Sequence, residues 1–268
     1  MHDPPTTHPP AAGHGPSAAF FDLDRTLISG SSAFVLGIAA YKAGFVPRRQ
    51  LVRDAAAALS FKVRGSTDDT TDAVRERILG AVQGMRVDDL VGLNEEVLPK
   101  LLAKIRPEAK RLLDLHRRSG RPTYIVSAAP VEIVEPLAAS LGMTAGIGTR
   151  SAIVESVYNG ELAGPFVYAA GKVTAMEELA RWEGLDLSQC YAYSDSHSDL
   201  PMLEAVGHPV AVNPDGPLAR HATESGWPIV HFSQQTKARI RHTLTGTGAL
   251  VVAASGFAAG TRYARDRA

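Results

Sequence analysis

Short apolar runs that end in polar residues restrict most strongly how this chain of 268 residues can fold. Such runs lie at 18–24, 122–127, 190–195, 210–212 and 229–232. Longer segments separate them, and one of these, 172–184, has helical periodicity and ends in glycine. Apolar strands that alternate with helices are typical of a parallel sheet buried on both faces. We therefore predict an α/β fold, with a doubly wound, mostly parallel sheet.

The segment between the first two runs is too long for a simple crossover between parallel strands. Apolar residues recur there at three- and four-residue spacing in four stretches, 33–44, 48–63, 70–84 and 87–104. This pattern predicts an inserted α-helical cap at 31–104, which would lie over the carboxyl ends of the strands. The α/β core would then consist of 18–30 and 105–236.

One further turn is predicted within the core. The dipeptide Asn159-Gly160 lies between alternating residues of the segment 157–162. Asn-Gly is strongly favoured in the type I′ turns of two-residue β-hairpins. We expect a hairpin that turns at these two residues.

The two ends of the chain differ in composition from the rest. Residues 1–17 are rich in proline and are expected to form a disordered leader, while 237–268 form a basic tail rich in small residues. Within this tail, 243–261 contain no charged residue and approach the length of a membrane span. Gly, Ala, Ser and Thr dominate the stretch, however. Two interpretations stay open: peripheral or C-terminal membrane association, or a helix that packs on the core or a partner.

The overall charge and the cysteine content exclude some classes of protein. The chain has 28 basic and 28 acidic residues, so no global positive field indicates a nucleic-acid partner. The single cysteine, Cys190, excludes an intramolecular disulfide and fits a cytoplasmic location. We interpret it as a buried packing residue. The sequence leaves the oligomeric state open.

Polar residues that could take part in catalysis or binding follow the first three apolar runs. Asp22 and Asp24 end the first run, Ser127 ends the second, and Asp195 ends the third, with Asp199 four residues later. Lys172 stands at the start of the helical stretch. The carboxyl ends of parallel strands form the ligand crevice of such sheets, so these side chains are expected to converge there. Each residue alone is also common in ordinary surface turns or as a solvated charge.

In this order the residues resemble the four motifs of the haloacid dehalogenase superfamily of aspartate-nucleophile phosphatases. The resemblance is closest to the phosphoserine-phosphatase-like branch, which has a helical cap between the first and second motifs. Three segments carry it: Phe20–Leu27, Ser194–Leu203 and Gly207–Pro214. It implies a Mg²⁺-dependent phosphomonoesterase that hydrolyses a small phosphorylated metabolite through an aspartyl-phosphate intermediate. A phosphotransferase with the same intermediate and a non-catalytic regulatory protein with this fold are the alternatives. A receiver-like signalling domain is disfavoured by the cap and by the nucleophile on the first strand.

The resemblance also implies a role for each site residue. Asp22 would be the nucleophile, and Asp24 would protonate the leaving alkoxide and then activate water. Mg²⁺ would be bound by Asp22, Asp195 and the main-chain carbonyl of Asp24. Asp199 would bind the metal through water or hold Lys172 in place.

The phosphate and the rest of the substrate require further contacts. Ser127 and Lys172 would bind the phosphoryl group. Arg25, Arg75 and Arg77 are candidate contacts for a substrate anion.

Two positions depart from the family pattern. Ser194 stands where the family commonly has glycine. Phosphoserine phosphatases carry an acidic residue at the start of the cap for the amino group of the substrate, but this chain has Ser29-Gly30-Ser31-Ser32. Phosphoserine specificity is therefore left open.

Overall fold

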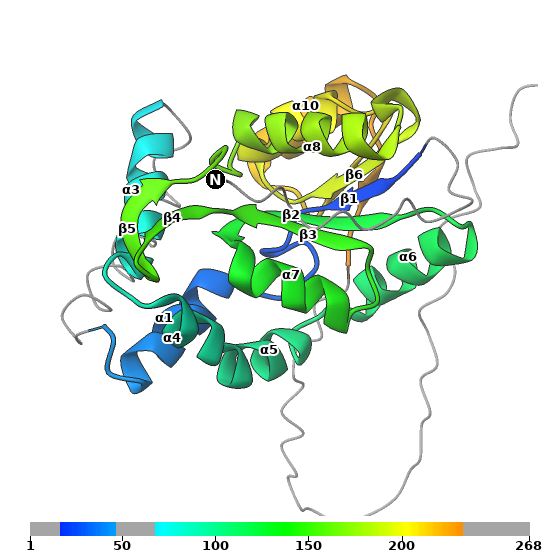
Figure 1. The fold of residues 1–268 in the computed structure, drawn as a ribbon. Coiled ribbons are helices and arrows are strands. Elements are labelled where there is room, and N and C mark those ends of the chain that lie inside the picture. The colour runs from blue at the N-terminus through cyan, green and yellow to red at the C-terminus, as the bar shows by residue number, and fades with distance from the viewer. Residues whose placement is uncertain (1–16, 47–67, 233–268) are drawn as a thin grey trace, which may run out of the picture. The chain divides into compact units, whose positions relative to one another are not determined.

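Six parallel strands form the central sheet of the computed structural model, which describes residues 17–46 and 68–232 (Figure 1). Their spatial order is β3-β2-β1-β6-β7-β8, and every neighbouring pair is parallel. The predicted doubly wound α/β fold is thereby confirmed. The strands are β1 Ala19–Phe21, β2 Thr123–Pro130, β3 Ala145–Thr149, β6 Tyr191–Ser194, β7 His208–Val212 and β8 Ile229–Val230.

Strand β3 is the one member of the sheet that the apolar pattern does not predict. Its sequence, Ala-Gly-Ile-Gly-Thr, contains two glycines, which weaken a strand signal. Both are required by close packing against helix α7 (Val131–Ser140). A Cβ atom at Gly146 would lie 2.5 Å from the carbonyl oxygen of Val134. The glycines therefore let the helix backbone approach the strand.

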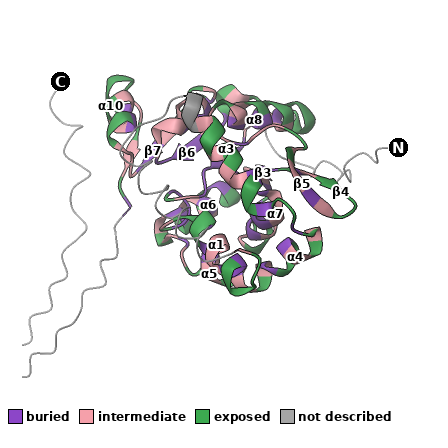
Figure 2. Cartoon of the chain, turned by 90° about the vertical axis from the view of Figure 1, so that its left-hand side faces the viewer, coloured by how far each residue is buried: buried purple, intermediate pink, exposed green. Residues whose placement is uncertain are grey.

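Helices cover both faces of the sheet, and side chains alternate between the faces along each strand. Phe21 and Ile125 point into one cluster, with α6 (Pro107–Arg118) and α7. Phe20 and Tyr124 point into the other, with α8 (Ala170–Glu183), α9 (Leu200–Glu204) and α10 (Gly216–Glu224). The exposed residues lie on the outer sides of these helices (Figure 2).

Two short 3₁₀ helices, Leu187–Gln189 and His197–Asp199, complete the connections on the side of α8 and α9. Cys190 is buried and unpaired in the cluster with Phe20, as expected for a packing residue.

The described residues between 31 and 104 form four helices: α1 Ser32–Lys42, α3 Asp68–Val82, α4 Val87–Gly92 and α5 Asn94–Leu102. The stretch 87–104, whose apolar spacing predicts helix, forms two separate helices, and α4 ends at Gly92, a poor helix former. Helix α5 contacts both α1 and α7. The predicted helix 48–63, the leader and the tail with 243–261 lie outside the described residues. The boundaries of cap and core stay a prediction.

A two-stranded hairpin of β4 (Ser151–Val154) and β5 (Val157–Leu162) follows β3. The predicted position of its turn is wrong. The chain turns at Glu155 and Ser156, whose φ angles of 50° and 65° are positive, as a type I′ turn requires. Asn159-Gly160 lies inside β5 instead, beside a shift of strand register. There the Asn159 side chain accepts a hydrogen bond from the Glu161 amide at 2.9 Å, so the dipeptide forms a local irregularity within the strand.

The hairpin is joined by backbone hydrogen bonds to the segment between α3 and α4. The Gly84 amide donates to the Tyr158 carbonyl at 2.9 Å, and the Tyr158 amide donates to the Met85 carbonyl at 3.0 Å. The Val87 amide donates to the Ser156 carbonyl at 3.0 Å. Residues 84–87 therefore run beside β5 as an additional antiparallel partner.

Within the described ranges, 17–46 and 68–232, the structure contains no helix of the length and apolarity that a membrane crossing requires.

Candidate active site

The predicted site residues meet at the carboxyl edge of the three central strands. Asp22 directly follows β1, Asp195 directly follows β6, and Ser127 lies in β2, which pairs with β1 on its other side. All three line one cavity of about 640 Å³, together with Asp24 and Lys172. The topology thus brings together residues that are as far as 173 positions apart in the sequence.

Lys172 lies at the centre of the polar end of this cavity. Its Nζ donates hydrogen bonds to Oδ1 of Asp22 at 2.7 Å and to Oδ2 of Asp199 at 2.8 Å. The lysine is only 2% exposed, so both contacts form in a poorly hydrated environment. Asp199 accepts a second hydrogen bond, from the Ser194 hydroxyl at 2.6 Å. The contact with Lys172 is the one that the second predicted role of Asp199 requires, and its role in the site stays a prediction.

The first turn of α8 places Lys172 by means of a close backbone contact. A Cβ atom at Gly171 would lie 1.8 Å from the carbonyl oxygen of Phe166, so only glycine fits there. The Gly-Lys pair therefore positions the start of the helix and its buried cation together.

Burial and charge repulsion shift the pKa values of the acidic residues. Burial raises the pKa of Asp22 to about 7, although the Lys172 ammonium opposes the shift. Burial, and then the negative charge of Asp22, raises the pKa of Asp195 to about 8. Burial alone would lower the pKa of Lys172, but the carboxylates of Asp199 and Asp22 outweigh it and raise that pKa. The polar end therefore concentrates more negative charge than Lys172 alone neutralises.

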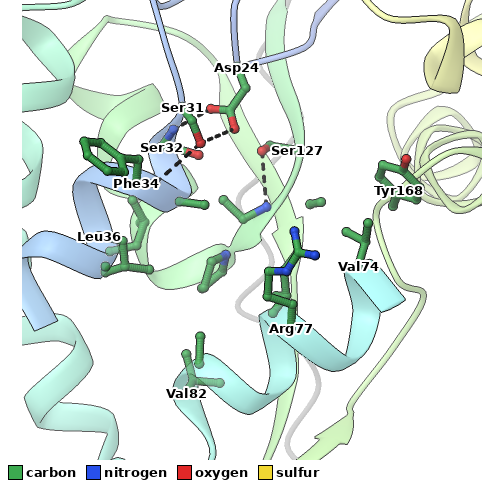
Figure 3. Close-up of a pocket in the computed structure, with 18 of the residues that line it drawn as sticks. Asp24, Ser31, Ser32, Phe34, Leu36, Val74, Arg77, Val82, Ser127 and Tyr168 are labelled. Atoms are coloured by element: carbon green, nitrogen blue, oxygen red, sulfur yellow. Dashed lines mark hydrogen bonds between the residues drawn. The ribbon is translucent and has the colours of Figure 1, made fainter. Parts of the chain in front are cut away.

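Asp24 is held by the start of helix α1. Its Oδ1 accepts a hydrogen bond from the Ser32 amide at 2.7 Å, and its Oδ2 accepts one from the Ser31 hydroxyl at 3.5 Å (Figure 3). Burial raises the pKa of Asp24 above its ordinary value, while the hydrogen bonds from Ser32 oppose this shift. The Ser31-Ser32 pair, which marked a departure from phosphoserine phosphatases, thus orients the second aspartate.

The three candidate arginines differ in their placement. Nε of Arg25 lies 2.9 Å from Oδ2 of Asp195, and the residue lines the cavity. Arg77 of α3 also lines the cavity (Figure 3). Arg75 is exposed, forms an ion pair with Asp72 at 3.0 Å and does not line the cavity. The structure therefore brings Arg25 and Arg77, but not Arg75, to the site.

Ser127 has its hydroxyl at the wall of the cavity, where Oγ accepts a hydrogen bond from the Ala129 amide at 3.2 Å (Figure 3). Because that bond uses the oxygen as an acceptor, the hydroxyl hydrogen is free to be donated to a phosphoryl oxygen. Ala128 and Ala129, the next residues of β2, also line the cavity.

The sequence did not predict the apolar part of the cavity. Helices α1, α3 and α4 contribute apolar side chains to it, among them Leu36, Ile78 and Leu90. Their helical periodicity alone indicates core packing, because a side chain that lines a cavity and one that fills a core follow the same spacing. Tyr168, which also lines the cavity, precedes the Lys172 helix and had no sequence signal.

The donor set expected for a cation fits the geometry. Oδ1 of Asp195 is buried and has no hydrogen-bond partner, whereas Oδ2 contacts Arg25. In the part of the chain that is described, no three His, Cys, Asp or Glu side chains converge on one point. The expected set needs only two carboxylates and a main-chain carbonyl, which suits a metal such as Mg²⁺ that retains water ligands.

Comparisons with known proteins identify the family of the chain. The family described as haloacid dehalogenase-like hydrolase matches residues 19–204. A probable phosphatase of Mycobacterium tuberculosis is 37% identical over 253 residues, which cover 94% of this chain and 88% of the relative. A phosphoserine phosphatase of the same organism is 36% identical, over 83% of this chain and 73% of the relative.

A solved structure of a Bordetella pertussis protein of unknown function superimposes with a TM-score of 0.71 at 26% identity. The similarity covers 81% of this chain and 99% of that protein. The sequence match to the family and the arrangement of the four motifs around one cavity lead to the same assignment. The predictions of the family and of an enzyme are confirmed: the chain belongs to the haloacid dehalogenase-like hydrolases.

Proposed function

We propose that the protein is a Mg²⁺-dependent phosphatase that hydrolyses small phosphate monoesters with Asp22 as nucleophile. The observation that carries this proposal is the buried arrangement of Asp22, Lys172 and Asp195 at one end of a cavity. Phosphate monoesters resist attack because their oxygens are anionic, so a site must offset that charge while it presents a nucleophile. The relatives that are named phosphatases support the same reaction.

The first step forms a bond between a carboxylate oxygen of Asp22 and phosphorus. The bond between phosphorus and the leaving oxygen breaks, and Asp24 donates a proton to that oxygen. The raised pKa of Asp24 supports this role, because it favours the protonated carboxyl group. The hydrogen bonds from Ser31 and Ser32 hold the carboxyl group in place before and after the transfer.

The second step hydrolyses the aspartyl phosphate. Asp24, now deprotonated, accepts a proton from water, whose oxygen bonds to phosphorus while the bond from phosphorus to Asp22 breaks. Phosphate is released and Asp22 is regenerated. Lys172 and Ser127, which line the same cavity as Asp22, would stabilise the phosphoryl oxygens in both steps.

Asp22, Asp195 and the main-chain carbonyl of Asp24 would hold the Mg²⁺ ion. When bound, the ion supplies positive charge that offsets the repulsion between the phosphate and the aspartates. The unpartnered Oδ1 of Asp195 and the raised pKa values of both carboxyl groups support this assignment. Asp199 remains a partner of Lys172 in this arrangement.

Hydrolysis of p-nitrophenyl phosphate by the purified full chain tests the proposal. We expect Asp22→Asn to lower kcat by at least about 1,000-fold, because the intermediate can no longer form. Asp88→Asn changes an exposed aspartate of α4 in the same way and serves as the control. Quenched turnover followed by peptide mass spectrometry would detect phosphate on Asp22.

EDTA treatment should abolish the activity, and added Mg²⁺ should restore it. Full activity after removal of metal would contradict the assignment of the cation, and activity of Asp22→Asn within tenfold of the wild type would contradict the nucleophile.

A further inference from the structure

The substrate cavity has two chemically different ends. The core end, which is the polar end described above, holds Asp22, Lys172 and Asp195. The cap end is formed by α1, α3 and α4. Resting on the proposed phosphatase function, we propose that the preferred substrates are phosphate monoesters of apolar or amphipathic alcohols, whose hydrocarbon part occupies the cap end. A phosphoamino acid would then be a poor substrate.

The side chains at the cap end carry this inference. Leu36 and Ala40 of α1 face the cavity together with Val74 and Ile78 of α3 and Leu93, which follows α4. Figure 3 shows Leu36, Val74 and Val82 around the space that extends from Ser127. Such a surface stabilises a hydrocarbon in proportion to the apolar area that it removes from water.

The charge at the cap end argues against an amino-acid substrate. Among the described residues between 31 and 104 that line the cavity, Arg77 is the only charged one. An ammonium group of a bound amino acid would therefore face a cation there and find no carboxylate from those residues. Burial of such an ammonium without an acidic partner would be costly.

The volume of the cavity agrees with a larger leaving group. At about 640 Å³ it lies in the range of pockets that bind drug-sized ligands, well beyond what a phosphate group alone fills. Phe34 lines the cavity and is 57% exposed, so it marks where the cavity meets solvent. An alkyl chain that leaves the phosphate can extend from the aspartates toward this opening.

A series of n-alkyl phosphates tests the inference, with the full chain, Mg²⁺ and concentrations at which the esters stay monomeric. Each buried methylene should raise kcat/KM about threefold to fourfold, so octyl phosphate should exceed ethyl phosphate by at least about 100-fold. O-Phosphoserine has the same three-carbon skeleton as n-propyl phosphate, and we expect it to be at least about tenfold poorer.

Variants of the cap end locate the hydrocarbon. Leu36→Gln and Ile78→Gln should each lower the octyl-to-ethyl ratio of kcat/KM by at least about fivefold, because an amide replaces apolar surface in the cavity. Val91→Gln makes a comparable change at a cap residue that is 47% exposed and does not line the cavity. That control should leave the ratio unchanged. Thermal unfolding of each variant separates a local effect from a loss of folding.

The outcomes distinguish failure of this inference from failure of the proposed function. If p-nitrophenyl phosphate is hydrolysed in a manner that depends on Asp22 but kcat/KM does not rise with chain length, the substrate class is wrong and the phosphatase stands. A preference for O-phosphoserine over n-propyl phosphate would overturn the inference in the same way. If no phosphate ester is hydrolysed, the proposed function itself fails.

Discussion

The two ends of the cavity are formed by different kinds of contact. At the core end, Asp22, Lys172, Asp199 and Ser194 are buried and joined by hydrogen bonds of 2.6–2.8 Å. At the cap end, side chains such as Leu36 and Ile78 have no directional partners and define the cavity by their shape alone. Directional contacts fix atoms within a fraction of an ångström, whereas apolar contacts set only size and affinity. From this difference we expect that the reaction and the choice of substrate can be altered independently in this chain.

The two ends also differ in how they tolerate loss of a side chain. Buried charges are costly unless they are paired. Removing the Lys172 ammonium would therefore leave the buried carboxylates of Asp22 and Asp199 without a compensating charge. An apolar wall that loses a side chain leaves a cavity, at a smaller cost.

Lys172→Met should have the largest effect. We expect kcat/KM for p-nitrophenyl phosphate to fall by at least about 1,000-fold, since the variant removes a cation from both the nucleophile and the phosphoryl group. The free energy of unfolding should fall by about 3 kcal/mol, measured by urea denaturation, because two buried carboxylates lose their ammonium partner. Lys110→Met, at an exposed position of α6, should change neither quantity measurably. Activity of Lys172→Met within tenfold of the wild type would contradict the expectation that the reaction depends on the charged contacts of the core end.

Leu101→Ala tests the apolar support of the cap helices. Leu101 of α5 is fully buried, and α5 contacts α1, but the residue does not line the cavity. We expect the free energy of unfolding to fall by about 2–4 kcal/mol, as for other buried leucines, while kcat/KM stays within about threefold. Leu115→Ala, at a leucine that is 57% exposed, should cost less than about 0.5 kcal/mol. A large loss of kcat/KM in fully folded Leu101→Ala would show that the two ends are coupled.

Ser194→Ala should have the smallest of the three effects on the free energy of unfolding. It removes the hydroxyl that donates to Asp199 and accepts from the Ser196 amide. We expect a decrease of about 1–2 kcal/mol in the free energy of unfolding and a loss of about tenfold in kcat, because Lys172 is held less firmly. Ser140→Ala removes an exposed hydroxyl that donates to the Pro136 carbonyl and is the matched control. Equal behaviour of the two variants would show that the Ser194 hydroxyl does not support the polar end.

Much of the polar end could be predicted from the sequence, because a polar residue at the end of an apolar strand can be recognised in the sequence itself. Asp22, Ser127 and Asp195 each follow or end such a run, and a parallel sheet brings those ends to one edge. The hydrogen-bond partner of each site residue could not be predicted in the same way. The contact between Ser194 and Asp199 depends on the turn of the loop after β6, which the sequence alone does not define.

The elements that were missed depend on tertiary packing. Strand β3 lacks an apolar signal because Gly146 and Gly148 accommodate the backbone of α7. The hairpin turn was assigned to Asn159-Gly160, since the local preference of that dipeptide is strong, but strand pairing places the turn at Glu155-Ser156. Leu36 and Ile78 could not be assigned to the cavity, because core and cavity residues share one helical pattern.

The pairing of residues 84–87 with the β4–β5 hairpin has a consequence for biosynthesis. The two partners are about seventy residues apart in the chain, so the cap helices emerge from the ribosome well before the strand that completes their hydrogen bonds. Contacts of such long range form late and slow the final assembly of a domain. A nascent chain that ends before Ser156 would lack all three of these hydrogen bonds, and its α3–α4 segment would present unpaired amides and carbonyls to other molecules in the cell.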